Sequence, residues 1–271
     1  GEANRAKAML APLAQPGLPL ADEAAEAIAQ ADRVLSLSRA APGYVRHLFD
    51  QFSADYDARM LENLSYRAPG ILRGLADLML GTPENPLAVL DLGCGTGLAG
   101  EAFADLAGRL DGVDLSPRMI EKARARGLYD ELAVGDLESA LDAGGEGYDL
   151  LIAADTLVYL GDLSHAFAGA ARRLKPGGFF LFTVEKHSGE GYELGPKRRY
   201  RHGEAYLRAG VVDNEWLDAR RAWRKYVRET IKASGTSRGA RLRWAVGVGA
   251  FMKDSIPAQK GTSHSNTTGS P

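Results

Sequence analysis

Residues 88–97 read AVLDLGCGTG, an apolar run that leads directly into glycines at alternate positions, Gly93, Gly95 and Gly97. Glycine lets the backbone take a positive φ and approach a ligand with no Cβ in the way. A helix is expected near 98–107, and the N–H groups at its start are free to bind an anionic group. The stretch therefore predicts a strand, a ligand-binding turn and a helix.

Short apolar runs alternate with helical stretches along the chain after this turn. The predicted strands are 88–92, 109–114, 131–135, 148–154 and 179–184. The predicted helices lie near 98–107, 117–126 and 162–174, and the glycine-containing connection 137–147 is the weakest helix candidate. Strands and helices in alternation are typical of an α/β fold with a parallel sheet and right-handed crossovers.

Asp114 ends the second predicted strand, seventeen residues after Gly97. A carboxylate in that place can accept hydrogen bonds from both hydroxyls of a ribose, so a ligand with an adenosine and an anionic end is implied. Residues 95–100 also match the dinucleotide pattern G-x-G-x-x-G. Asp91, however, places a negative charge where a pyrophosphate would lie, and that charge suits an ammonium and a sulfonium. The pattern therefore favours S-adenosylmethionine (SAM) over NAD.

Residues 89–97 and 112–119 resemble the first two motifs of class I SAM-dependent methyltransferases, which implies a Rossmann-like sheet with flanking helices. By that resemblance the glycine loop holds the methionine part of SAM. The residues that the resemblance assigns to the cofactor are Asp91 for the amino group, Asp114 for the ribose, and Leu115 and Met119 for the two faces of the adenine.

Later motifs extend this resemblance. Asp136 and Leu137 match the position where an acid meets the adenine amino group. Asp155, at the end of the fourth strand, faces the region of the methyl donor. Residues 174–178 match the turn into the fifth strand.

A narrower resemblance covers residues 40–208 and is to predicted methyltransferases with tetratricopeptide (TPR) repeats upstream. It implies that Tyr56 and Arg67 close over the methionine end, as part of an N-terminal helical lid at 44–69. The alternative is that Phe49, Phe52 and Tyr56 form the core stripe of an ordinary helix, and both can hold together.

Candidates for a general base follow the fifth strand, and the chosen ones are Glu185 and His202. A base is needed only if the acceptor must lose a proton before it attacks. The stretch after the fourth strand lacks the Asn/Asp-Pro-Pro-aromatic set with which enzymes that methylate the amino nitrogen of a nucleic-acid base hold that nitrogen. Enzymes that methylate carbon 5 of cytosine need a Pro-Cys nucleophile, and the single cysteine, Cys94, lies in the glycine loop. A small-molecule acceptor is therefore favoured. A protein methyltransferase, a non-catalytic SAM-binding scaffold and, last, an NAD oxidoreductase remain open, and no metal site is predicted.

The composition further limits the classes of protein to which the chain can belong. The 271 residues carry a net charge of −2, which gives no general attraction to nucleic acid or anionic membrane. No apolar run approaches the ~20 residues of a membrane helix, and the acidic first thirty residues do not resemble a signal peptide. One cysteine cannot form an internal disulfide, so a cytoplasmic location is expected.

Four regions are predicted along the chain. The first, 1–43, is a helical extension that could be a remnant of TPR repeats and could bind a protein partner. The methyltransferase domain with its lid spans 44–209. Then follow a divergent basic segment at 210–253, with a charged helix at 211–231 and a strand candidate at 241–251, and a disordered tail at 254–271.

Overall fold

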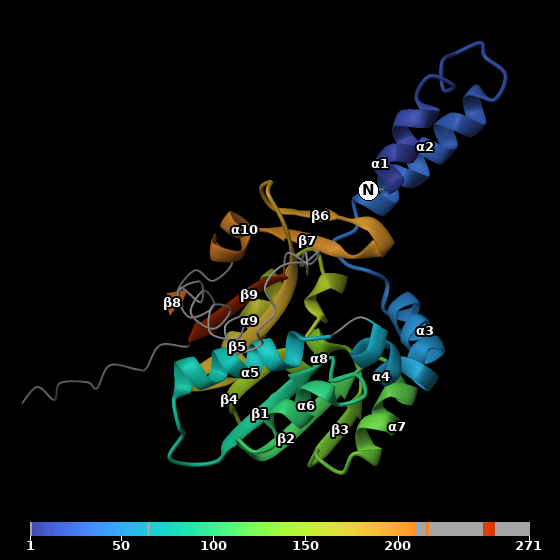
Figure 1. The fold of residues 1–271 in the computed structure, drawn as a ribbon. Helices are drawn as coiled ribbons and strands as arrows, with labels where there is room; N and C mark the ends of the chain where they lie inside the picture. The colour runs from blue at the N-terminus through green and yellow to red at the C-terminus, as the bar shows by residue number, and fades with distance from the viewer. Residues whose placement is uncertain (1, 64–65, 210–214, 217–245, 253–271) are drawn as a thin grey trace, which may run out of the picture.

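The computed structural model describes residues 2–63, 66–209, 215–216 and 246–252. Within these residues one sheet has the strand order β3-β2-β1-β4-β5-β7-β6, with β9 beside β5 and β8 beside β9 (Figure 1). The strands are β1 (Leu87–Leu92), β2 (Ala107–Asp114), β3 (Glu131–Val134), β4 (Tyr148–Ala153), β5 (Leu174–His187), β6 (Tyr192–Leu194), β7 (Tyr200–Gly203), β8 (Glu215–Trp216) and β9 (Val246–Met252). Strands β1 to β5 run parallel, which confirms the predicted Rossmann-like α/β fold.

Helices cover both faces of the sheet because successive strand residues point to opposite sides. Val89 of β1 packs in a cluster with α5 (Ala68–Leu80) and α6 (Leu98–Phe103). Leu90 and Leu92 pack in the other cluster, with α8 (Leu137–Asp142) and α9 (Ser164–Arg173). Helix α7 (Pro117–Ala125) packs against β2 and β3. The carboxyl ends of β1, β2 and β4 consequently meet at one edge of a two-sided core, where ligands bind in open α/β sheets.

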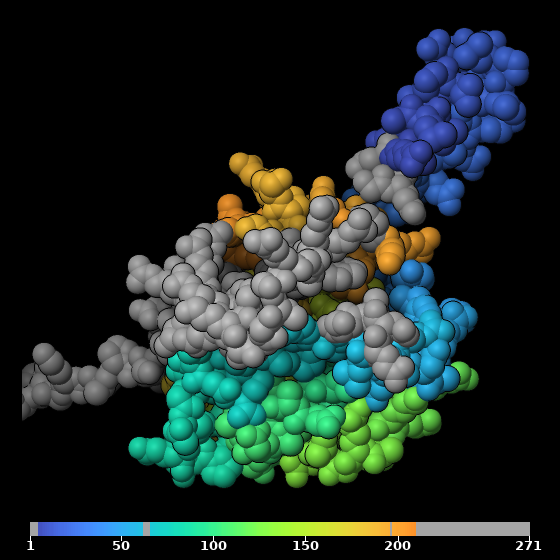
Figure 2. All heavy atoms as spheres, in the orientation of Figure 1, coloured from blue at the N-terminus to red at the C-terminus, as the bar shows by residue number. Residues whose placement is uncertain are grey.

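The N-terminal helices α1 (Glu2–Leu10) and α2 (Ala21–Leu35) pack on each other as a hairpin. This hairpin projects from the rest of the molecule (Figures 1 and 2). The chain joins the sheet domain before the predicted boundary at residue 43. Ala40 N–H donates to the Tyr159 carbonyl at 2.8 Å, and the Ser38 carbonyl accepts from the N–H groups of Gly161 and Asp162 at 2.7 and 2.9 Å.

The predicted lid is a helix followed by short turns: α3 (Pro42–Phe52), η1 (Ser53–Asp55), α4 (Tyr56–Ala58) and η2 (Arg59–Asn63). It lies beside α7 (Figure 1). Ser116 Oγ donates to Asp50 Oδ1 at 2.6 Å, and Lys122 Nζ donates to the Ala54 carbonyl at 2.8 Å. The segment therefore packs on the carboxyl end of β2, where Asp114 lies.

Two predicted boundaries were wrong, and the weakest helix candidate, 137–147, does contain a helix. Helix α6 ends at Phe103 rather than near 107, because β2 already begins at Ala107. The weak connection after β3 contains α8, whose N-cap is Asp136, with Oδ1 accepting from Glu138 N–H at 3.0 Å. The expected turn at 174–178 lies inside β5, since Leu174 already pairs with Tyr148 and a bulge precedes the next pair.

The end of the domain contains η3 (Leu157–Tyr159) before α9, then η4 (Pro196–Arg198) and α10 (Glu204–Ala209) after β5. Strand β9 runs antiparallel to β5, which confirms the strand candidate over 246–251. Strand β8 falls inside the charged helix predicted at 211–231, so that prediction is wrong at 215–216. The rest of 210–253 and the tail 254–271 lie outside the described residues. None of the described helices is both long and apolar enough to span a membrane.

Candidate active site

The three loop glycines all have positive φ, 72° at Gly93, 56° at Gly95 and 92° at Gly97, but their surroundings differ. A Cβ on Gly93 would lie 2.4 Å from the Thr156 side chain, and one on Gly97 would lie 2.9 Å from Arg126. A Cβ on Gly95 would meet nothing within 4 Å. Close packing thus accounts for two of the glycines, and Gly95 is where the backbone is open to a ligand.

Asp114 is held at the end of β2 by two backbone donors. Gly95 N–H donates to Oδ2 at 3.0 Å and Ser116 N–H donates to Oδ1 at 2.8 Å. Burial raises the pKa of this carboxyl, and the two N–H donors act against that rise. Each carboxylate oxygen retains a lone pair, so the group can still accept two hydroxyl donors. This geometry fits the ribose of SAM.

A pocket opens at this edge of the sheet, between Asp114 and the segment after β3. It is lined by Arg39, Ala40, Val45, Gly93, Val113, Asp114, Leu115, Gly135, Asp136, Leu137, Thr156, Tyr159 and Leu160. Five of the predicted cofactor residues are among them, namely Gly93, Asp114, Leu115, Asp136 and Leu137. Met119 is fully buried and is not part of the lining.

Asp91 is completely buried beside the glycine loop. Its Oδ2 accepts from the Tyr129 hydroxyl at 2.8 Å, and its Oδ1 has no hydrogen-bond partner among the described residues. Burial raises the pKa of this carboxyl to about 7 and the Asp114 charge adds to the rise, while the Tyr129 hydroxyl and the Gly100 N–H oppose it. The unpartnered oxygen fits an ammonium group, which would supply both a donor and a positive charge.

The position of Tyr129 also accounts for Gly100, the last glycine of the dinucleotide pattern in residues 95–100. A Cβ on Gly100, the last glycine of that pattern, would lie 2.2 Å from the Tyr129 hydroxyl. Gly100 therefore leaves room for the tyrosine that binds Asp91. The sequence analysis did not identify Tyr129, because the match to a pattern does not show which side chain fills the space.

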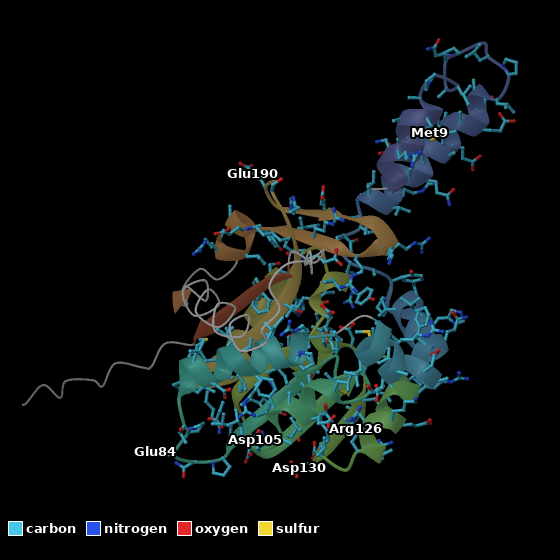
Figure 3. All side chains as sticks on the ribbon, in the orientation of Figure 1. Met9, Glu84, Asp105, Arg126, Asp130 and Glu190 are labelled. Carbon is cyan, nitrogen blue, oxygen red and sulfur yellow. The ribbon has the colours of Figure 1, made fainter. Side chains whose placement is uncertain are left out.

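The lid is fastened to the glycine loop by Asp57. Its carboxylate accepts from Thr96 Oγ1 and from an Arg126 guanidinium nitrogen, the latter at 2.6 Å. Arg126 also donates from Nε to the Thr96 carbonyl at 2.6 Å, and Figure 3 shows it near the end of α7 on the lid side. The lid and the loop thus share one hydrogen-bonded group that sequence analysis missed.

Tyr56 lies close to Asp155, Tyr159 and Arg199. Burial raises the pKa of its phenol, and the nearby carboxylates of Asp155 and Asp114 raise it further. Its ring lies 6.1 Å from Phe49, whose ring lies 5.6 Å from Tyr159. Phe49 is half-buried and contacts these rings, whereas Phe52 is 37% exposed, so the core-stripe interpretation is at most partial.

Arg67 has an exposed side chain at the N-cap of α5 and makes no ion pair with any described residue. Arg199 is the arginine that lies at the donor end. Its Nε donates to Glu185 Oε1 at 2.6 Å, its guanidinium is 3.8 Å from Asp155 Oδ1, and its Cζ lies 5.9 Å from the centre of the Tyr159 ring. Glu185 is therefore already paired, with Arg201 a further 3.6 Å contact.

Asp155 follows β4 with a φ of 58°, a conformation that costs a non-glycine residue energy and is often found at functional sites. Its N–H donates to Thr183 Oγ1 at 2.8 Å, and that hydroxyl donates to Asp155 Oδ1 at 3.3 Å. Burial raises the pKa of the carboxyl, and the Arg199 charge opposes the rise. Asp155 is thus held at the site by both its backbone and its side chain.

His202 lies in a different environment from the one expected of a base. The side chain is fully buried, with Nε2 at 2.9 Å and 3.1 Å from the carbonyls of Leu160 and Gly161. Nε2 must therefore carry the hydrogen, and Nδ1 is buried without a partner in the described part of the chain. Burial lowers the pKa of the imidazole to about 4. These contacts fit a residue that fastens the 160–161 turn.

Comparison with known proteins agrees with this geometry. Residues 89–178 match a family described as a methyltransferase domain. Methyltransferase-like protein 27 from Homo sapiens is 34% identical over 148 residues, which are 52% of this chain and 58% of that protein. Ubiquinone biosynthesis O-methyltransferase from Xanthomonas oryzae pv. oryzae is 34% identical over 103 residues, 36% of this chain and 43% of that protein. The chain therefore spans about half the length of the curated relatives it matches.

The fold is similar to that of solved methyltransferase structures. The structure of magnesium protoporphyrin IX methyltransferase from Synechocystis PCC 6803 with bound SAM superposes with a TM-score of 0.54 and 17% identity, covering 79% of this chain and 97% of that one. Residues 89–178 thus match a methyltransferase domain, and the fold is that of a solved methyltransferase. The match and the fold also support SAM as the cofactor of this domain.

Proposed function

We propose that the chain transfers a methyl group from SAM to a small-molecule acceptor. The observation that carries the proposal is that Asp114 lies beside Gly95. The carboxylate can accept the ribose hydroxyls, and the open backbone at Gly95 leaves room for the adjoining sulfur end of the cofactor. Asp136 and Leu137, with Leu115, are proposed to hold the adenine. Asp91 is proposed to take the ammonium, which its unpartnered oxygen supports.

When bound, SAM supplies a methyl group activated on a sulfonium. The contribution of the protein is to place the acceptor in line with that methyl and to keep water away, as proximity and desolvation require. Tyr56 and Tyr159 cover the donor end from the lid and from η3. The lid residue Asp57, bonded to Thr96, holds this cover against the loop.

An O–H acceptor must lose its proton during transfer, and Asp155 is the better candidate to receive it. Its raised pKa and its fixed position support that role. Glu185 accepts a hydrogen bond from Arg199 and lies near Arg201, so its role here is to hold Arg199 in place. The buried imidazole of His202 is not assigned a role in proton transfer.

The acceptor class rests on two supports. The donor end is enclosed by Tyr56, Tyr159 and Arg199, which suits a small molecule better than the side chain of a folded protein. The O-methyltransferase name of one relative points in the same direction. A protein acceptor is the second candidate.

The direct test is transfer of a labelled methyl group from SAM into fractionated small-molecule and protein pools. We expect label in the small-molecule fraction, and at least tenfold less of it with Asp114→Ala at limiting SAM, because this change removes the ribose acceptor but leaves the donor end intact. Label confined to protein would move the proposal to the second candidate. Binding of SAM with no label in either pool would leave a non-catalytic scaffold.

The projecting α1–α2 hairpin supports a separate proposal, that this part of the chain contacts a protein partner. Its origin as the last of several TPR repeats is part of that proposal and rests on the resemblance of residues 40–208. A cytoplasmic location is also proposed, on the single buried cysteine, Cys94.

A further inference from the structure

Arg39 lies in the pocket lining although it is fifty residues before the methyltransferase match begins. Its two terminal guanidinium nitrogens donate to different carboxylates, one to Asp136 and one to Glu138. Its side chain is 32% exposed, and those of Asp136 and Glu138 are 18% and 15% exposed. One planar cation therefore joins the two acids that begin α8.

These contacts leave Asp136 with little freedom to rotate. Oδ1 accepts from Glu138 N–H at 3.0 Å as the N-cap of α8, and Oδ2 accepts from Arg39. Each oxygen still has a lone pair. A carboxylate held at both oxygens can accept a hydrogen bond from an amino group only in a set direction.

The backbone around Arg39 is fixed as firmly as its side chain. Residues 38–40 form three hydrogen bonds with residues 159–162, and the Tyr200 hydroxyl donates to the Leu37 carbonyl at 2.9 Å. The turn that receives this segment is itself bonded to His202. The backbone that carries the Arg39 guanidinium is consequently fixed beside the pocket.

The Nε of Arg39 is buried and has no hydrogen-bond partner among the described residues, so this nitrogen is not exposed to the pocket. Arg39 can therefore act on a ligand in the pocket through Asp136, which its terminal nitrogen holds. The 6-amino group of adenine is a donor that an oxygen of Asp136 can accept.

We infer that Arg39 is a positioning residue that makes the cofactor site selective for adenine, by holding Asp136 in place to receive the 6-amino group. The inference rests on the proposed function, because it presumes that the adenosine of SAM binds in this pocket. It differs from that proposal in assigning the selectivity to a residue outside the matched domain.

The test compares S-adenosylhomocysteine with S-inosylhomocysteine, in which a carbonyl oxygen replaces the 6-amino group. Calorimetry on the full chain gives the affinity for each, and their ratio measures adenine selectivity. Arg39→Met keeps the aliphatic stem and removes the cation. We expect the affinity for S-adenosylhomocysteine to fall roughly tenfold or more, as for loss of a charged hydrogen-bond partner, and the ratio to fall toward one.

Arg109→Met is a matched control. Arg109 is also 32% exposed and pairs with two acids, through its Nε 3.3 Å from Asp111 Oδ2 and through Nη1 2.7 Å from Glu146 Oε2. It lies toward the opposite end of β2 from Asp114 and does not line the pocket. Its replacement should leave both affinities and their ratio unchanged.

Arg39→Lys guards against a folding defect, since it keeps the charge in place. One ammonium cannot reproduce the planar fork, so we expect this variant to fold and still lose selectivity. Unchanged selectivity in a folded Arg39→Met or Arg39→Lys variant overturns the inference and leaves the proposed function standing. Failure of the unaltered chain to bind S-adenosylhomocysteine overturns both.

Discussion

The adenosine end and the methyl-donor end of the site are built in different ways. At the adenosine end, Asp114, Leu115, Asp136 and Leu137 come from two short stretches that follow β2 and β3. At the donor end, Tyr56, Asp155 and Arg199 come from the lid, β4 and the chain after β5. The first end is thus largely a property of local motifs, whereas the second exists only once distant segments have packed together.

Under the proposed function, this difference separates the residues that bind the cofactor from those that select the acceptor. The adenosine end uses two carboxylates, Asp114 and Asp136, each held by a backbone N–H within its own local segment or the adjoining glycine loop. The donor end uses a balanced set of buried charges, in which Arg199 lies against Glu185 and Asp155. A change at one end should therefore affect binding, and a change at the other should affect turnover.

The largest effect is expected at the adenosine end, from Asp114→Ala. Two charge-assisted hydrogen bonds to ribose hydroxyls would be lost, each worth roughly 1.5–3 kcal/mol, so the affinity for S-adenosylhomocysteine should fall at least tenfold. Calorimetry measures the fall, and circular dichroism checks the fold. Asp142→Ala, a surface change near His165 and Arg172, is the control. Unaltered affinity in a folded Asp114→Ala variant would contradict the assignment.

Asp91 predicts a pH dependence of binding. Its folded pKa of about 7 lies above the ordinary value near 4, so the carboxyl is largely protonated below pH 7. An ammonium needs the ionised form, so affinity for S-adenosylhomocysteine should be full above pH 7 and fall by up to about tenfold per unit below it. Calorimetry from pH 5.5 to 8.5 measures this, and Asp91→Asn should give a weak, flat profile. A flat profile in the unaltered protein would remove Asp91 from the site.

The same pKa has the opposite consequence for the protein without ligand. Between about pH 4 and 7 the folded state binds more protons at Asp91 than the unfolded state, so this group lowers the free energy of unfolding as pH rises. His202, with a folded pKa of about 4, raises it between about pH 4 and 6.5. Asp91→Asn should therefore raise the Tm of the ligand-free protein at pH 8 while weakening binding. A lower Tm would mean that the hydrogen bond from Tyr129 to the ionised Asp91 stabilises the fold by more than burial of that charge destabilises it.

At the donor end, Arg199→Gln should separate binding from turnover. We expect transfer of labelled methyl to fall about tenfold or more, because Asp155 and Glu185 lose the charge between them. The affinity for S-adenosylhomocysteine should change by less than about threefold, since the adenosine end is untouched. Arg67→Gln, an exposed change, is the control for the lid side. Equal losses of affinity and rate in Arg199→Gln would show that the two ends do not act separately in binding and turnover.

The sequence predicted the two ends unequally for the same reason. The strand, the glycine loop and Asp114 are close in sequence, so a local pattern was sufficient to find them. Arg39 and Asp136 are 97 residues apart, and Asp57 and Thr96 are 39 apart, so their contacts depend on how helices pack. His202 was chosen for its residue type, and its complete burial could not be inferred from its neighbours in the chain. Arg199, which the sequence analysis did not select, lies 3.8 Å from Asp155, whereas Arg67 is exposed at the N-cap of α5. The sequence alone could not distinguish these two positions, because they depend on how distant segments pack.

The smallest effect is expected from Asp57, which joins the lid to the glycine loop. Asp57 belongs to neither end of the site, so its replacement tests the lid by itself. Its carboxylate is 37% exposed and Arg126 is 23% exposed, so the ion pair is worth roughly 0.2–1 kcal/mol. Asp57→Ala should accordingly weaken S-adenosylhomocysteine binding by only about two- to fivefold. Hydrogen exchange over 44–63 should become faster, with the difference largest in the bound state, if the lid closes on the cofactor. Asp55→Ala is the matched control, because Asp55 pairs with Arg59 at 2.6 Å wholly within the lid. If the two variants exchange alike, the Asp57 contact is only a surface pair and the lid is held by the packing of Phe49 and Tyr56.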